Sequence, residues 1–295
     1  MPIPLIVVGA GALFGIRGAK KMKDAKDTME IAERCHKANL ARFEKQNKET
    51  TRSVETLTAL ELEIVKSFED FSNVFEKIQN KPEFKEYVRG DVRIPSYSGE
   101  ELKRVSIGAT ALLSGIGGAT ISSSASAAAV AGAGIAGGGG IALLSAATLG
   151  IGALVGGAIF NFAGSSLSNK ADEAYSQMRQ DEKEIDRICD YMGKLSTTAN
   201  KYRDVLSKVN KVYMAHLTRL KQIVNLDGKT DYNYFSGDER LLVKNSSLLV
   251  GLLYKMCKVQ IVQKAKDENE MNKINHIDIT RSIAEADSFL SENKF

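Results

Sequence analysis

The sequence predicts an all-α protein: an elongated helical bundle with long coiled-coil-like helices and a central glycine-rich apolar helical hairpin. Two observations predict this class. Residues 20–81 and 170–228 carry apolar side chains at separations of three, four or seven, which is the repeat of an amphipathic helix. Between them lie 65 consecutive residues, Val105 to Asn169, without Asp, Glu, Lys, Arg or His, and these residues include 15 of the 25 glycines.

The first predicted element is an apolar segment over residues 1–19. Arg17, Lys20 and Lys21 follow its apolar run, whereas a secretory signal peptide carries its positive charge ahead of that run. We therefore expect a protein made in the cytoplasm without a signal peptide, which associates with membrane by switching from a soluble to an inserted form. The segment also contains two glycines at the GxxxG spacing that lets helices approach closely.

The same glycines imitate a nucleotide-binding turn, because residues 5–15 read LIVVGAGALFG. A dinucleotide fold needs a second strand that ends in an acidic residue about 20 residues further on. The chain continues instead as a long polar helix, which favours helix packing over a nucleotide site. We expect no cofactor and no enzyme activity, because the sequence shows no paired carboxylates, activated Ser or Cys, or metal cluster.

A long amphipathic helix is predicted over residues 20–81, ended by Pro82. Its apolar stripe contains Val54, Leu57, Ile64, Phe68, Phe71, Phe75 and Ile78. Residues 82–104 are a predicted linker, in which alternating polar and apolar residues indicate a short hairpin. Ser98 and Glu101 have the S-x-x-E spacing of a helix-capping box just before the uncharged run.

The uncharged run over residues 105–169 is the predicted membrane hairpin. The four glycines 137–140 divide it into two arms, each long enough for a hydrocarbon core of about 30 Å. The flanking basic residues Lys103, Arg104 and Lys170 are typical of ends on the cytoplasmic side. The residues predicted to insert or to pack helices are Gly11, Gly15, Gly134, Gly138, Leu143, Leu144, Leu149, Gly152, Leu154, Gly156, Ile159, Phe160 and Phe162.

Three other interpretations of this run stay open at this point. It is also compatible with the buried centre of a soluble bundle and with a flexible low-complexity insert. The stretch AVAGAGIAGGGG is in addition compatible with silk-like β pairing, because alternating Ala and Gly stack well as a flat sheet. A helical and a β form of the run before insertion would have the same composition, so both forms stay open here.

A second long heptad helix is predicted over residues 170–228. Its apolar seam contains Ile185, Ile188, Met192, Leu195, Ala199, Tyr202, Leu206, Val209, Tyr213, His216, Leu220 and Ile223. We expect Tyr213 and His216 to pack with their polar tips at the edge of the seam, and a pH-sensing role for His216 is the alternative. The seam over residues 185–223 is the predicted contact for a protein partner.

Two shorter helices are predicted in the carboxy-terminal part, residues 236–295. Ser236 and Glu239 have the capping-box spacing and open the first of them. Asp278 is the predicted cap of the second, which is amphipathic through Ile279 and Leu290.

Composition excludes several classes of protein. Cys35, Cys189 and Cys257 are odd in number and form no CxxC pair, so we expect reduced thiols rather than a disulfide framework or a metal site. The three histidines are isolated from one another, which also predicts no metal. A net charge of +4 is too small and too evenly spread for a nucleic-acid-binding protein.

The order of a long helix, an uncharged hairpin and another long helix over residues 20–226 resembles the α-helical pore-forming toxins of the cytolysin A and tripartite enterotoxin type. A more distant similarity is to apolipoprotein L-like membrane proteins. The resemblance implies a membrane-active protein that inserts its hairpin and permeabilises a lipid bilayer as a homo-oligomer, either as a toxin or as an intracellular effector. The alternative is a hairpin-anchored coiled-coil tether or scaffold without pore activity.

Overall fold

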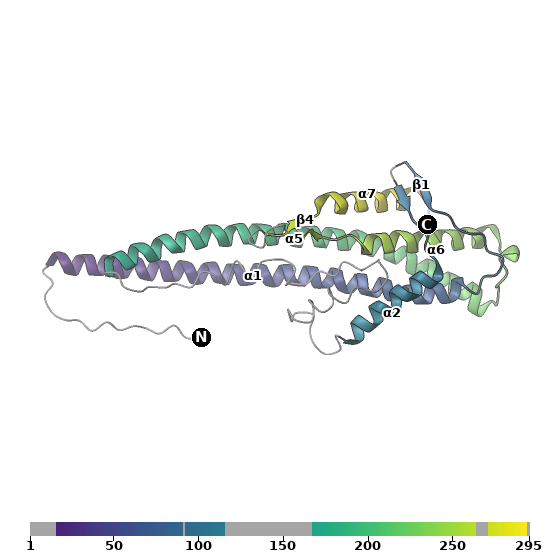
Figure 1. Ribbon diagram of the computed structural model, residues 1–295, viewed down its shortest axis with the longest axis horizontal. Helices are drawn as coiled ribbons and strands as arrows, with labels where there is room; N and C mark the ends of the chain where they lie inside the picture. Colours follow the sequence, from purple (N-terminus) through teal and green to yellow (C-terminus); the bar gives the residue numbers. More distant parts are fainter. Residues whose placement is uncertain (1–15, 91, 116–166, 264–270, 294–295) are drawn as a thin grey trace. The chain divides into compact units, whose positions relative to one another are not determined.

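The computed structural model describes residues 16–90, 92–115, 167–263 and 271–293 (Figure 1). Of the described residues, 78% are helical and the strands are few and short, which confirms the all-α class. The elements are α1 (Ile16–Phe75), β1 (Tyr87–Arg89), β2 (Val92–Ile94), α2 (Gly99–Gly115), α5 (Leu167–Lys221), the π-helical turn η2 (Gln222–Leu226), the 3-10 turn η3 (Tyr232–Tyr234), α6 (Gly237–Cys257), β3 (Val262–Gln263), β4 (Lys273–Ile274) and α7 (His276–Glu292).

The contacts divide the chain into two compact units. Unit 1 consists of Met1–Gln46 and Gly156–Asp190, and unit 2 consists of Asn47–Val155 and Tyr191–Phe295. Helices α1 and α5 each contribute to both units. Unit 1 has a small described core in which Ala32 and Met178 are buried.

In unit 2, α1 and α5 lie side by side and run in the same direction (Figure 1). The Oγ1 atom of Thr50 donates to the carbonyl of Met192 at 3.1 Å, and the hydroxyl of Tyr213 donates to the carbonyl of Ser67 at 3.2 Å. In these two bonds the later residue of α1 is paired with the later residue of α5, so the two helices run parallel.

Helix α1 ends at Phe75, six residues before the predicted end at residue 81. The backbone of Gln79 explains the difference, because its N–H donates to the carbonyl of Thr230 at 2.6 Å and its carbonyl accepts from the N–H of Tyr232 at 3.0 Å. These partners lie in the connection between α5 and α6, and a backbone paired there is not available for a further helical turn.

The predicted seam of α5 is buried inside the chain. Its residues in unit 2 that are almost fully buried are Met192, Leu195, Ala199, Tyr202, Leu206, Val209, Tyr213, Leu220 and Ile223. His216 is the exception: it is half-buried, and its neighbour Leu217 takes the core position. Burial lowers the pKa of His216 and so favours its neutral form.

The linker forms the predicted hairpin, in which β1 and β2 pair antiparallel with Tyr87 opposite Ile94. Gly90, with φ of +55°, supplies the left-handed turn. A second pair, β3 with β4, has only two residues in each strand and was not predicted.

The ends of the carboxy-terminal helices test the capping predictions. The Ser236 side chain accepts from the N–H of Glu239 and the Glu239 side chain accepts from the N–H of Ser236, which confirms the capping box of α6. The predicted Asp278 cap is wrong, because the N-cap of α7 is Asn275, whose side chain accepts from the N–H of Asp278. Asn275 is buried, so the packing of its side chain determines that it, and not Asp278, caps α7.

Replacing Ser236 by Ala is expected to lower the free energy of unfolding by about 1 kcal/mol, because an N–H of the first turn of α6 loses its acceptor. Urea titration followed by far-UV circular dichroism measures the change. Ser207→Ala is the matched control, since Ser207 is also exposed but lies inside α5. Equal effects of the two substitutions would contradict a capping role.

Candidate functional site

Helix α2 leads into the uncharged run, and its start carries the second predicted cap. The N–H of Glu101 donates to Oγ of Ser98 at 3.2 Å, and Glu100 and Glu101 place negative charge in the first turn. Both features stabilise a helix amino terminus. The S-x-x-E pattern therefore marks the real beginning of α2 at Gly99, inside the segment predicted as linker.

Helix α2 is fixed to α1 by two hydrogen bonds from side chains to backbone. Oγ of Ser72 donates to the carbonyl of Gly99 at 2.9 Å, and Oγ of Ser106 donates to the carbonyl of Lys66 at 2.8 Å. The contact is close: a Cβ atom on Gly99 would lie 2.7 Å from Oε1 of Glu76. The two pairs show that α2 runs antiparallel to α1.

The predicted boundary of the membrane hairpin at residue 105 differs from the observed packing. Val105 and Ser106 are buried, together with Leu102, so the first two residues of the uncharged run belong to the core of unit 2. The next residue, Ile107, is 59% exposed. Among the residues of the run whose side chains the structure describes, Val105 and Ser106 therefore pack in the core and Ile107 faces outward.

Among the predicted flanking cations, Lys103 forms an ion pair with Oε2 of Glu76 at 3.5 Å, and Arg104 is exposed. Arg17, Lys20 and Lys21 lie in α1, and Lys170 lies in α5. The predicted insertion and packing residues that lie outside the described residues are Gly11, Gly15, Gly134, Gly138, Leu143, Leu144, Leu149, Gly152, Leu154, Gly156, Ile159, Phe160 and Phe162. Within the described ranges, none of the helices combines the length and the apolar character needed to cross a membrane.

A buried polar cluster joins α5, α6 and α7 in unit 2. The Tyr202 ring is fully buried, and its hydroxyl donates to the carbonyl of Met256 at 2.8 Å and lies 3.0 Å from Oγ of Ser282. Burial raises the pKa of the Tyr202 hydroxyl well above its usual value. The hydroxyl therefore stays neutral and acts as a fixed hydrogen-bonding group.

Glu61 of α1 is buried beside this cluster. The residue is 2% exposed, and its Oε1 atom has no hydrogen-bond partner among the described residues. Burial raises the pKa of the Glu61 carboxyl well above its usual value. An acidic group in this setting resists ionisation, because the charged form has lost its water.

The sequence contained a signal for Glu61 that the prediction of the apolar stripe passed over. Leu57 and Ile64 are seven residues apart, and Glu61 occupies the intervening stripe position, four after one and three before the other. A charged residue at that spacing is normally read as an interruption of the stripe. Here the stripe continues and buries the carboxyl.

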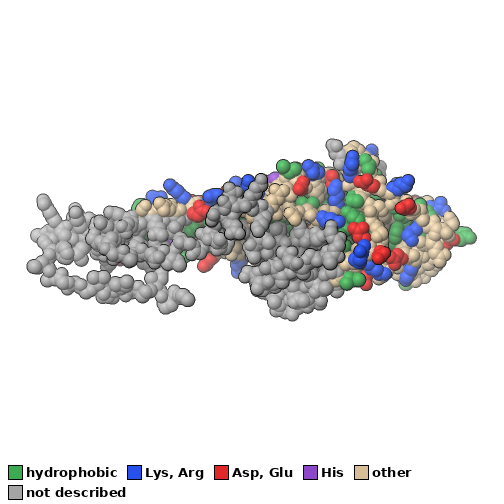
Figure 2. Space-filling view, viewed as in Figure 1, with side chains coloured by type: hydrophobic (Ala, Val, Ile, Leu, Met, Phe, Trp, Pro, Cys, Tyr) green, Lys and Arg blue, Asp and Glu red, His purple; other side chains and the backbone are tan. Residues whose placement is uncertain are grey.

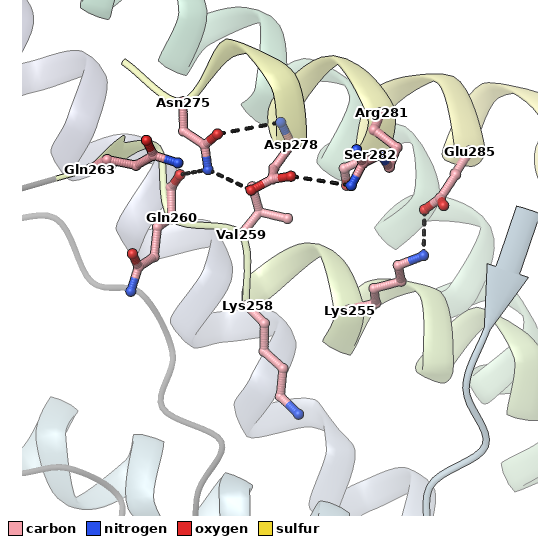
Figure 3. A pocket seen from close by; sticks show the side chains of 10 residues that line it. All are labelled: Lys255, Lys258, Val259, Gln260, Gln263, Asn275, Asp278, Arg281, Ser282 and Glu285. Atoms are coloured by element: carbon pink, nitrogen blue, oxygen red, sulfur yellow. Dashed lines mark hydrogen bonds and ion pairs between the residues drawn. The ribbon is translucent and has the colours of Figure 1, made fainter. Parts of the chain in front are cut away.

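A cleft of about 390 Å³ lies between α6 and α7 (Figure 3). Both of its carboxylates already have cationic partners: Glu285 accepts from Nζ of Lys255 at 2.6 Å, and Asp278 pairs with Arg281 at 3.3 Å. Lys258 points away from the Lys255–Glu285 pair, and its Nζ atom lies 4.0 Å from the centre of the Tyr254 ring. These interactions favour a structural role, holding α7 against α6.

A larger hollow of about 840 Å³ adjoins the end of α1. Lys81, one of the two lysines that line it, donates to the carbonyl of Ile78 at 2.8 Å and lies 5.0 Å from the centre of the Phe75 ring. Burial lowers the pKa of Lys81, and the Glu76 carboxylate partly offsets this effect. The ammonium group is directed back to the turn that follows α1 and to the Phe75 ring at the end of that helix.

Charges of both signs are interspersed over the described part of the face in Figure 2. The described residues contain no group of three or more His, Cys, Asp or Glu side chains arranged to hold a metal ion. The three cysteines, Cys35, Cys189 and Cys257, are free thiols, as predicted.

Comparison with known proteins found no match: no family model, no curated protein and no solved structure matches this chain.

Proposed function

We propose that this chain is a membrane-active helical protein that inserts its uncharged run as a helical hairpin and permeabilises a bilayer as a homo-oligomer. Its soluble form is an elongated helical bundle. One observation carries the proposal: 65 residues without a charge, Val105 to Asn169, are entered through a helix whose base is fixed to α1. The inserting part begins after Ser106, because Val105 and Ser106 are packed in the core.

The second arm of the run supplies the driving force for insertion. Between residues 141 and 162 it has ten large apolar side chains, each contributing about −0.3 to −0.6 kcal/mol to insertion, or about −3 to −6 kcal/mol together before its Gly and Ser residues are counted. Its glycines and those of the first arm permit close helix contacts within an oligomer. No enzymatic step is involved.

The seam over residues 185–223 is a weaker candidate for the oligomer contact. Its side chains in unit 2 are buried within one chain, and the Tyr202 hydroxyl is bonded to α6 and α7. A partner at this seam would have to displace those helices. The hairpin is therefore the favoured site of assembly.

The test is release of dye from anionic liposomes by the full-length protein, with flotation of the same samples to measure binding. The variant carries Leu144→Arg and Leu154→Arg, because one arginine at the centre of an inserted helix costs about 2.5 to 3.5 kcal/mol. The matched control carries Leu226→Arg and Leu241→Arg, at positions that are 81% and 52% exposed. We expect release by the parent and the control, and loss of release by the hairpin variant.

Other outcomes separate the alternatives. Binding by the parent without release supports the tether. Release that the hairpin arginines leave unchanged contradicts insertion of the uncharged run. A parent that neither floats nor releases dye, over a range of pH and lipid composition, argues against membrane activity.

A further inference from the structure

A buried acid in the core of unit 2 faces two other ionisable groups. From α5 the Tyr202 hydroxyl lies near Glu61, and from α6 the Cys257 thiol does. Burial raises the pKa of both groups, and a carboxylate at Glu61 adds to both rises. Each of these groups is neutral when protonated, so neither offers a positive charge to an ionised Glu61.

Two cations at the carboxy-terminal end of α6, Lys255 and Lys258, are engaged elsewhere. Nζ of Lys255 in α6 pairs with Glu285 of α7 and donates to the carbonyl of Arg93 at 2.8 Å. Lys258, the C-cap of α6, lies over the rings of Tyr97 and Tyr254. Burial alone accounts for the raised pKa of Glu61, and no described cation opposes it.

A second buried polar group close to Glu61 in the sequence also lowers the stability of the packed core. One helical turn earlier, Oγ1 of Thr58 is also buried without a hydrogen-bond partner among the described residues. A buried polar atom without a partner is destabilising, and an ionised one is far more so. An opening that exposes this stretch of α1 to water would supply hydrogen-bond partners to both atoms.

We propose that the ionisation of Glu61 controls a conformational switch in unit 2. In the closed state the neutral acid is buried in the core, and in the open state the ionised carboxylate has separated α1 from the α5 and α6 surface that covers it. The step is the loss of one proton from the carboxyl to water. This device is a property of unit 2 and does not depend on membrane activity.

The direction of the pH dependence follows from the raised pKa of Glu61. Its stabilising contribution to the closed core is fully present below about pH 4.5, the value for an exposed carboxyl, and is lost as the pH rises through the higher value in the core. Raising the pH therefore favours opening, by about tenfold in the opening constant per pH unit within that window.

The experiment uses Cys257 as the reporter, because this fully buried thiol reacts only when the core opens. The full-length protein is treated with iodoacetamide at pH 6 to 9, and modification is followed by mass spectrometry of the peptide that contains Cys257. Rates are divided by those of an unstructured cysteine peptide at the same pH, which removes the intrinsic thiolate dependence. Glu61→Gln is the test variant, and Glu63→Gln, at an exposed glutamate two residues away, is the matched control.

In the parent and in Glu63→Gln, we expect the corrected rate at Cys257 to rise by about tenfold per pH unit over part of this range. In Glu61→Gln we expect a lower and nearly constant rate. A constant corrected rate in the parent overturns the proposal whether or not any variant folds. The same slope in Glu61→Gln as in the parent also overturns it.

Discussion

Replacing Tyr202 by Ala is expected to lower the free energy of unfolding of unit 2 by about 3 to 5 kcal/mol, the usual loss when a buried aromatic side chain is truncated. The ring of Tyr202 is fully buried in α5, and its hydroxyl joins the backbone of α6 to Ser282 of α7. The substitution removes apolar packing and also leaves the carbonyl of Met256 without this donor. Urea unfolding followed by circular dichroism measures the loss.

Two companion variants separate the contributions at Tyr202. Tyr202→Phe keeps most of the packing and removes the hydroxyl, so we expect a loss of about 1 to 3 kcal/mol. Tyr234→Ala truncates a tyrosine that is 82% exposed, and a change within about 0.5 kcal/mol is expected there. If Tyr202→Phe lowers the free energy of unfolding by no more than Tyr234→Ala does, the Tyr202 hydroxyl does not hold the three helices together.

Replacing Gly251 by Ala is expected to lower the free energy of unfolding by about 1 to 3 kcal/mol, as overpacking of a well-filled core does. A Cβ atom on Gly251 would collide with the carbonyl oxygen of Pro95 and would lie 3.0 Å from Cγ2 of Ile94. The first contact is with backbone, so no change of side-chain rotamer relieves it. The residues after β2 would have to move away from α6.

Gly237 provides the matched control in the same helix. It lies in the first turn of α6, and a Cβ atom there would meet nothing within 4 Å. Gly237→Ala should therefore change the free energy of unfolding by less than about 0.5 kcal/mol. Hydrogen exchange should show faster exchange in β1 and β2 for Gly251→Ala only, and equal exchange in both variants would contradict the close approach.

The helical pattern was predictable because it depends on local spacing. The apolar repeats predicted α1 and α5, and the S-x-x-E patterns at Ser98 and Ser236 marked the starts of α2 and α6. The alternation of polar and apolar residues predicted the β1–β2 hairpin. Each of these signals lies within a few residues and acts through the backbone of its own segment. The hypothesis that the chain inserts into membranes and forms a pore rests on the composition of the uncharged run, and the liposome experiment tests it.

Features that depend on a distant partner were not predictable. Helix α1 stops at Phe75 because Gln79 pairs with the connection between α5 and α6, more than 150 residues away. Asn275 rather than Asp278 caps α7, because packing buries Asn275. Val105 and Ser106 belong to the core although they are the first two residues of the uncharged run.

By itself, the sequence determined that the chain is mainly helical and that two long amphipathic helices lie on either side of a stretch of 65 uncharged residues. Only the tertiary structure decided that α1 and α5 run parallel, that α2 is fixed to α1, and that Glu61 is buried. The physical reason is that helix formation follows side-chain periodicity along one segment. Burial of a polar group, in contrast, depends on which distant helix removes it from water.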